Sequence, residues 1–425
     1  MDRIISKYIT TFFLGFNSGV SYATLGAVLT IYLNDFSISY VLLGFLSLRL
    51  LPYSFKGFWS PVLDIMPMRL FPAGFGHRKS WVVFTQIIIA LCFLIFGLLK
   101  NPQDQIWLIT INAVVAAFMA ASYDNVLHGY RIELFPQELQ PKANTIISIS
   151  FKIGFFASLG ASLVITEYLA WEIFFIVLSL VYIPGIVIFI FSYEKKSISK
   201  NLSISQNFKQ VKRNYFAPFM ALVKSKYALP IAIIVMFFKA SDSFMDTLLV
   251  PYLLEIGFSK TQTAGYSKFI GFISYTIGTL VGGYFLHKKI HIIKTMICVE
   301  ILSAISNLGF IPLMYYKSTL LLSIVSLLES MSSSMCNIVL ITFLSYFSKS
   351  TLRFSGTFYA VLQSLSLLNR FIISSFSGLT VEVFGWKVFL IASSLLSIPA
   401  LCGCFYLLSR QEEATSFFRK AREAE

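Results

Sequence analysis

The sequence predicts an all-α membrane protein in which twelve transmembrane helices form two six-helix bundles, with both termini in the cytoplasm. The first observation is composition, because 56% of the 425 residues are hydrophobic and 13% are charged. A soluble protein carries roughly a quarter charged residues. The second is segmentation into apolar stretches of about 20 residues, the length that crosses a bilayer. The third is the distribution of basic residues, which sets the orientation.

The apolar segments divide into two sets of six. A long polar stretch over 194–228 carries eight Lys or Arg residues and separates them. We therefore predict an N-terminal bundle over 1–193, a basic cytoplasmic linker over 194–228, a C-terminal bundle over 229–408 and a cytoplasmic tail over 409–425. The expected helices cover 9–33, 40–59, 80–99, 106–128, 144–166, 171–193, 229–253, 263–286, 294–315, 319–344, 354–380 and 386–408.

Basic residues gather in alternate loops. With both termini in the cytoplasm, the cytoplasmic segments hold 24 of the 34 Lys and Arg residues, and the opposite loops hold 4. Cytoplasmic loops of membrane proteins carry such an excess, so the bias predicts an N-in, C-in topology in an inner or plasma membrane. The basic loops also favour contact with anionic membrane lipid. Because the net charge of +14 lies in these loops, we expect no nucleic-acid partner.

Six basic side chains remain inside the apolar segments, where a charge costs at least a few kcal/mol unless it is paired, faces a polar cavity or reaches an interface. They are Arg49, Lys56, Lys152, Lys239, Lys268 and Arg370. Their number indicates a chain that holds or moves something polar, and an anion suits their charge. The sequence shows no metal-ligand cluster, phosphate loop or nucleophile–base arrangement, so we expect no cofactor, no metal and no enzymatic activity.

The loops after the second and eighth expected helices look related. Helix 2 ends in the run Gly57-Phe-Trp-Ser-Pro-Val-Leu-Asp64, and Gly76-His-Arg-Lys79 opens helix 3. Helix 8 ends in Gly282-Gly283, and His287-Lys288-Lys289 follows, although this second copy lacks an acid that matches Asp64. Two sets of six helices with related loops are typical of major facilitator transporters, which hold substrate near the midplane between two bundles.

Several segments in the right order resemble the AmpG muropeptide permeases, a branch of that superfamily. The most specific is the Lys-x-x-Trp-Ser-Pro-x-x-Asp element within 55–64. The full set is 14–19, 55–64, 76–81, 121–126, 239–242, Glu329, 369–370 and 385–386. The sequence departs from the family at Tyr123 and His128, which stand beside Asp124 where the family has Gln and a second acid. It also departs at Arg49, where the family is commonly uncharged.

The resemblance implies a symporter that imports anhydro-muropeptides across the bacterial inner (plasma) membrane for peptidoglycan recycling, driven by the proton gradient. The expected partners are an anionic small-molecule substrate, the coupling proton and membrane lipid, and we expect a monomer. Relatives in the wider branch carry acetyl-CoA, so another anionic or nucleotide-linked metabolite is an alternative substrate. A receptor or sensor that kept the fold and lost transport is an alternative of another class.

Candidate substrate-binding residues are the deep cations. Lys152 lies roughly 12 Å into helix 5 at 1.5 Å per residue, too deep to reach the interface easily. Arg370 can hold a carboxylate with two hydrogen bonds. We expect these two, one from each bundle, to clamp an anion, or else to pair with acids. The further candidates are Asn369, Lys239 and Arg49, whereas Lys56 and Lys268 lie near helix ends and are expected to extend toward the interfaces. Because Lys56 belongs to the specific motif, a structural role at the cytoplasmic gate is the alternative for it.

Candidate proton-coupling or gating residues are acids and one imidazole. Asp124 and His128 share a helix face with Arg131. Asp124 is therefore either a titrating group or a static partner of Arg131, and His128 either relays a proton or lies in a solvated loop. Lys239 shares a face with Asp242 and Asp246, as a permanent or an exchangeable salt bridge. Glu329 in helix 10 completes this set.

A third set of residues is typical of the cytoplasmic latch of the superfamily, which engages helix 11 in the outward-facing state. In this sequence the set comprises Asp64, Gly76, Arg78, Lys79 and Arg131. The alternative for Arg78 and Lys79 is an ordinary basic loop that obeys the orientation rule.

Overall fold

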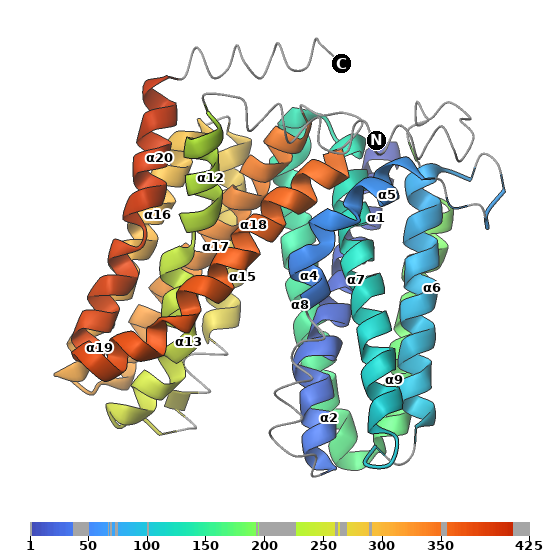
Figure 1. Cartoon of the computed structure of the whole chain (residues 1–425), viewed down its shortest axis with the longest axis horizontal. Coiled ribbons are helices and arrows are strands. Elements are labelled where there is room, and N and C mark those ends of the chain that lie inside the picture. The colour runs from blue at the N-terminus through green and yellow to red at the C-terminus, as the bar shows by residue number, and fades with distance from the viewer. Residues whose placement is uncertain are drawn as a thin grey trace. The chain divides into compact units, whose positions relative to one another are not determined.

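The computed structural model describes residues 2–36, 51–66, 68, 70–72, 75–99, 102–192, 194, 227–259, 262–263, 270–288, 291–349 and 355–410. Within these ranges every regular element is a helix (Figure 1). The helices are α1 (Asp2–Ala23), η1 (Thr24–Val28), α2 (Leu29–Asp35), α4 (Leu51–Phe55), η3 (Lys56–Phe58), α5 (Ser60–Ile65), α6 (His77–Leu98), α7 (Ile106–Leu134), η4 (Gln137–Leu139), α8 (Gln140–Tyr168), α9 (Trp171–Ile190), α12 (Ala228–Phe237), α13 (Ala240–Glu255), α15 (Ile270–His287), α16 (Ile292–Leu308), η6 (Ile311–Met314), α17 (Thr319–Lys349), α18 (Ser355–Ser375), α19 (Ser377–Leu395) and α20 (Ile398–Ser409).

Nine helical stretches of the described residues are long and apolar enough to cross a membrane. They are Ile5–Leu33, His77–Leu98, Ile106–Leu134, Gln137–Thr166, Trp171–Ile190, Ala228–Glu255, Ile292–Met314, Thr319–Lys349 and Ser377–Ser409. Part of the expected helix 40–59 and part of 263–286 lie outside the described residues. The multi-pass, all-helical architecture is therefore confirmed, while the number twelve stays a prediction.

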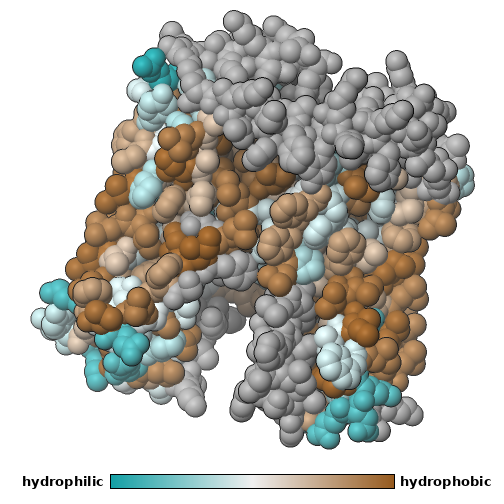
Figure 2. Space-filling view, in the orientation of Figure 1, coloured by the Kyte–Doolittle hydropathy of each residue, from teal (hydrophilic) through white to brown (hydrophobic). Residues whose placement is uncertain are grey.

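Hydrophobic side chains on the outside of the helices fit a lipid environment. On α6, the exposed residues Ile87, Leu91, Ile95 and Leu98 follow one another at spacings of three or four. Such spacing places them on one side of the helix. Figure 2 shows hydrophobic residues over much of the described surface on this face, with hydrophilic residues toward the helix ends. In water such stripes would be costly, whereas in a bilayer they are the expected outer surface.

The chain forms two compact units. The first groups residues 1–136, 146–217 and 352–361, and the second groups 137–145, 218–351 and 362–425. The domain boundaries expected from the sequence stay a prediction.

In the first unit, glycines bring α1 and α8 close together. A Cβ atom on Gly19 would overlap the carbonyl oxygen of Phe151, and one on Gly154 would overlap that of Phe16. Small residues of this kind let two membrane helices pack backbone against backbone. The unit also packs α6 against α7 and α9, and α1 against α7 and α9.

In the second unit, glycines likewise allow close packing of α15 against α17. A Cβ atom on Gly278 would overlap the backbone of Met331, and one on Gly282 would lie 2.7 Å from a side-chain carbon of Ile338. Elsewhere α13 packs against α19, where the rings of Phe244 and Phe389 stack with centroids 5.0 Å apart.

Three helices differ from the sequence prediction because the backbone breaks inside them. The expected helix 229–253 is interrupted where Lys239 adopts a left-handed conformation with φ 69°. The expected helix 40–59 contains the 3₁₀ turn η3. The segment expected as 354–380 is interrupted between Ser375, where α18 ends, and Ser377, where α19 begins. Hydrophobicity alone does not reveal such breaks, because the apolar character continues through them.

Candidate functional site

A buried ion pair joins η3 to α7 in the first unit. The Lys56 ammonium contacts the Asp124 carboxylate directly, and only 1% of the Lys56 side chain is exposed. Ser18 of α1 donates its hydroxyl to the same carboxylate at 3.3 Å, and the Nε2 atom of His128 lies 3.4 Å from it. The prediction that Lys56 extends to the interface is wrong. An acid partner inside the bundle compensates its charge, so the side chain has no need to reach the headgroups.

The partner of Asp124 is Lys56, which the sequence interpretation had not paired with it. Arg131, the alternative partner, is completely buried, and its guanidinium lies 5.4 Å from the ring centroid of Tyr359. His128 is buried as well, with its ring 4.3 Å from the Tyr359 ring, so the solvated-loop alternative is wrong. Tyr359 belongs to the first turns of α18, which group with the first unit.

The Trp of the specific motif also contacts α7. The indole nitrogen of Trp59 donates to the hydroxyl of Ser122 at 3.0 Å, and its ring lies 4.7 Å from that of Phe118. Lys56 and Trp59 thus attach the same short stretch of chain to neighbouring turns of α7. This gives the motif a physical role, because both of its long side chains fix one helix against another.

Trp59→Phe should lower the free energy of unfolding by about 1 kcal/mol, because the ring contact is kept while the hydrogen bond to Ser122 is lost. Thermal unfolding of the purified protein in detergent would measure this. Trp107→Phe is the matched control, since Trp107 is 78% exposed, and it should change little. Equal shifts for the two variants would contradict the role of the hydrogen bond.

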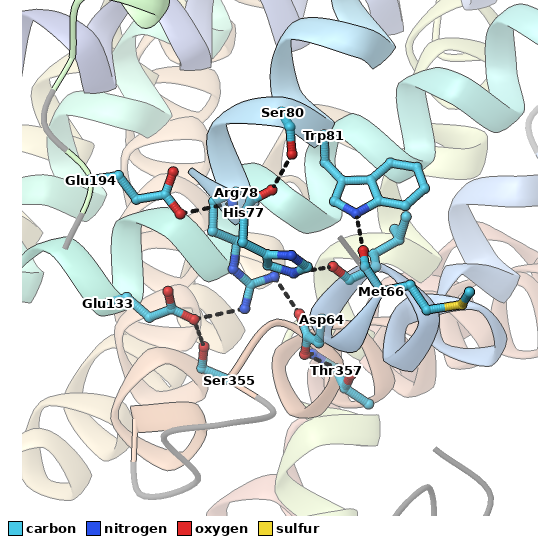
Figure 3. Close-up of polar contacts among 11 residues, drawn as sticks. Asp64, Met66, His77, Arg78, Ser80, Trp81, Glu133, Glu194, Ser355 and Thr357 are labelled. Atoms are coloured by element: carbon cyan, nitrogen blue, oxygen red, sulfur yellow. Dashed lines mark hydrogen bonds and ion pairs between the residues drawn. The ribbon is translucent and has the colours of Figure 1, made fainter. Parts of the chain in front are cut away.

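A second cluster gathers around Arg78 at the start of α6 (Figure 3). Its guanidinium contacts the Asp64 carboxylate and donates to Glu133 at 2.7 Å. Asp64 in turn accepts hydrogen bonds from the backbone nitrogen and the hydroxyl of Thr357, both at 2.7 Å. Ser355 donates to Glu133 at 3.0 Å. The cluster therefore connects α5, α6 and α7 to the beginning of α18.

The first turn of α6 is held by a residue beyond α9. The Glu194 carboxylate accepts hydrogen bonds from the backbone nitrogens of Arg78 at 2.8 Å and Lys79 at 3.0 Å. Burial raises the pKa of the Glu194 carboxyl, and these two N–H groups act against that rise. Lys79 donates to the carbonyl oxygen of Ile190 at 3.0 Å. The orientation of Arg78 thus depends on α9 as well as on its charged partners.

Gly76→Ala should destabilise this turn. Gly76 has φ 109° and ψ 139°, a region that is costly for any residue with a Cβ atom, by about 1–3 kcal/mol. The new Cβ would also overlap Glu194. Gly385→Ala is the matched control, since Gly385 has φ 77° and a Cβ added there would meet nothing within 4 Å. The thermal midpoint should fall further for Gly76→Ala than for Gly385→Ala. Equal decreases would mean that backbone strain alone, without the overlap with Glu194, accounts for the effect at Gly76.

The second unit brings the other predicted acids near Lys239. Its ammonium lies 3.8 Å from the Asp242 carboxylate, which also accepts a hydrogen bond from Ser303 of α16. Glu329 is buried and accepts from Ser330 at 3.0 Å, whereas Asp246 is exposed. Glu300 is a further buried acid that the sequence interpretation did not propose as a site residue, and its carboxylate lies 3.8 Å from the Cys336 sulfur.

Four of the in-membrane residues singled out from the sequence fall wholly, or with their side chains, outside the described part of the chain. Arg49 and Lys268 lie outside the described residues, and Asn369 and Arg370 belong to α18 with side chains outside the description. Lys152 is half-buried in α8, with its ammonium 5.9 Å from the ring centroid of Phe155. The clamp of Lys152 and Arg370 therefore stays a prediction.

The residues missed from the sequence share one property, which is that their partners come from distant parts of the chain. They are Glu133, Glu194, Ser355 and Thr357 around Arg78, and Lys56 as the partner of Asp124. A usable signal existed for Glu133, an acid near the end of an apolar helix. In the part of the chain that the structure describes, no group of three or more His, Cys, Asp or Glu side chains is placed to hold a metal ion.

Comparison with known proteins gives the family. The model of the Major Facilitator Superfamily matches residues 11–372. The chain belongs to this superfamily of transporters. The crystal structure of the superfamily transporter FucP in its outward conformation covers 94% of this chain and 99% of its own, with a TM-score of 0.67 at 13% identity. This likeness supports the expected fold.

The similarity to muropeptide permeases is also confirmed. The anhydromuropeptide permease of Escherichia coli K12 is 25% identical over 391 residues, which are 91% of this chain and 77% of the permease. A Rickettsia conorii relative called AmpG 4 is 25% identical over 399 residues, 93% of this chain and 95% of the relative. The resemblance in the motifs therefore extends over nearly the whole chain.

Proposed function

We propose that this transporter imports anionic muropeptides, the anhydro-disaccharide peptides of cell-wall turnover, across the bacterial inner membrane together with protons. The observation that carries the proposal is the similarity to an anhydromuropeptide permease over 91% of the chain. The buried cations give it physical support, because a carboxylated ligand needs positive partners where water is scarce. Twelve membrane-spanning helices, a monomeric state and an N-in, C-in topology complete the proposal, the last on the bias of the basic loops.

The cluster around Arg78 supplies the gating part of the proposal. It holds the beginning of α18 through two hydrogen bonds to Asp64 and one to Glu133. Because Arg78 joins both acids, loss of its contacts would release Thr357 and Ser355 together. In a transporter that alternates between two states, such a buried cluster favours the state in which it is formed. We assign Asp64, Gly76, Arg78 and Lys79 to this latch, with Glu133 and Glu194 as additional members.

Uptake into liposomes tests the function. The purified full-length protein would be reconstituted, and uptake of labelled anhydro-muropeptide measured with and without an inward proton gradient. We expect uptake that the gradient accelerates. Uptake of a nucleotide-linked anion in place of the muropeptide would assign another substrate. Uptake independent of the proton gradient would overturn the proposed coupling. Binding of muropeptide without uptake would indicate a receptor that has kept the fold.

A further inference from the structure

The Lys56–Asp124 ion pair lies at a break in a helix. Lys56 is the first residue of the 3₁₀ turn η3, which separates α4 from α5. On either side, Phe55 and Trp59 have φ near −100° and ψ near 0°, so the regular helix stops and restarts there. A short 3₁₀ stretch inside a helix often marks a hinge. A change of bend at η3 would therefore move the Lys56 ammonium relative to Asp124.

Basic side chains outnumber carboxylates around Asp124. The ionisable groups of the described residues that act on the Asp124 carboxylate or are affected by it come from η3, α4, α7 and α18. They are Lys56, Tyr53, Tyr123, His128, Arg131 and Tyr359. Lys56 and Arg131 are basic side chains, whereas Asp124 is the one carboxylate in this group. The surroundings of Lys56 thus favour negative charge.

Among the described residues, the buried polar side-chain atoms that lack a hydrogen-bond partner include two near the pair. They are the hydroxyl of Tyr53, one turn before Lys56, and the Nδ1 atom of His128. Buried polar atoms in proteins are nearly always satisfied, by protein groups, by water or by a ligand. A polar ligand beside Lys56 would offer such partners, which is evidence independent of the ion pair itself.

We propose that Lys56 binds a carboxylate of the substrate. In the absence of substrate the Asp124 carboxylate occupies this ammonium, and Asp124 accepts the coupling proton when the substrate carboxylate replaces it. The inference rests on the proposed function and adds the groups that perform the coupling. A hydronium ion gives its proton to the Asp124 carboxylate and leaves as water, which makes the side chain neutral. The Lys56 ammonium keeps its own protons and pairs with the substrate carboxylate. One negative charge replaces another, so the buried ammonium stays compensated throughout.

The corresponding pair in the second unit fits this role less well. Lys239 and Asp242 are 3.8 Å apart, and the Lys239 side chain is 22% exposed. The buried acids Glu300 and Glu329 act on that pair as two further protonatable groups. A proton taken up there would be shared among several buried acids, whereas Asp124 is the one carboxylate among the described groups around Lys56 and His128. This simpler set of groups favours the first unit for the exchange of one proton and one substrate carboxylate.

Calorimetric binding of an anhydro-muropeptide to the purified full-length protein tests the exchange. Titrations in two buffers with different ionisation enthalpies report the protons taken up on binding. For the wild type we expect uptake of about one proton per ligand and weaker binding at higher pH, as linkage requires. Asp124→Asn should bind without proton uptake and independently of pH. The double variant Lys56→Gln/Asp124→Asn should bind more than about tenfold more weakly than Asp124→Asn. A tenfold change corresponds to about 1.4 kcal/mol, and a hydrogen bond to a charged group contributes more than that.

Two further variants guard against trivial explanations. Lys142→Gln removes one exposed cation from the start of α8 and should bind with normal affinity and proton uptake. Lys56→Arg keeps the positive charge and should retain binding. If the double variant Lys56→Gln/Asp124→Asn binds the anhydro-muropeptide as tightly as the wild type does, the inference is overturned. This comparison does not depend on whether the single variant Asp124→Asn folds. Proton uptake that persists in Asp124→Asn would overturn it too while leaving the proposed function intact. Absence of muropeptide binding to the wild type would instead overturn the proposed function, and this inference with it.

Discussion

Arg78→Gln should produce the largest loss of transport among the substitutions considered for this protein. The change leaves the carboxylates of Asp64 and Glu133 without their shared cation, and the Asp64 side chain is completely buried. Breaking a buried pair by removing one partner costs about 3–5 kcal/mol, because an uncompensated charge stays in the interior. We expect a lower thermal midpoint in detergent and little muropeptide uptake in liposomes.

The double variant Arg78→Gln/Asp64→Asn separates charge from shape. It removes the uncompensated carboxylate while keeping side chains of similar size, so part of the lost stability should return. Uptake should stay low, because a neutral Asn at position 64 is a weaker hydrogen-bond acceptor for Thr357 than the Asp64 carboxylate. Lys294→Gln, which removes an exposed cation in α16, should leave both measurements unchanged. Full uptake in Arg78→Gln would exclude the cluster from gating.

The sequence predicts the charged cluster in part because its residues obey simple local rules. Asp64, Arg78 and Lys79 are charges at the ends of apolar segments, and Gly76 precedes a helix. Composition and segment length likewise predict an all-helical membrane protein, since helices satisfy their own backbone hydrogen bonds in lipid. What no local rule gives is the partner. Thr357 is 293 residues from Asp64 along the chain, and only the folded helices bring the two together.

For Lys56 a local rule that usually holds predicted the wrong position of the side chain. A lysine within two turns of a helix end normally extends to the interface. Here an acid on another helix lies within reach, and Lys56 begins a 3₁₀ turn in place of a continuous helix. Neither the tertiary partner nor the backbone break leaves a mark in the hydrophobic pattern. The same holds for Lys239, whose left-handed conformation ends one helix and begins the next.

Gly154→Ala should destabilise the first unit although alanine is the better helix former. On propensity alone the substitution would stabilise α8 by about 1 kcal/mol. The added Cβ, however, would overlap the carbonyl oxygen of Phe16 and lie 2.9 Å from its carbonyl carbon. These are backbone atoms of α1, so no side-chain rotation relieves the overlap, and the two helices must separate. Overpacking of this kind costs about 1–3 kcal/mol.

Gly160→Ala on the same helix is the matched control, because nothing lies within 4 Å of the Cβ that the substitution would add there. The same chemical change should then raise the thermal midpoint slightly or leave it unchanged, while Gly154→Ala lowers it. Opposite signs for one substitution at two positions of α8 cannot come from helix propensity. They would show that glycine is needed at 154 for the approach of α1. A common direction for both variants would mean that α1 and α8 do not pack as closely as the structure shows.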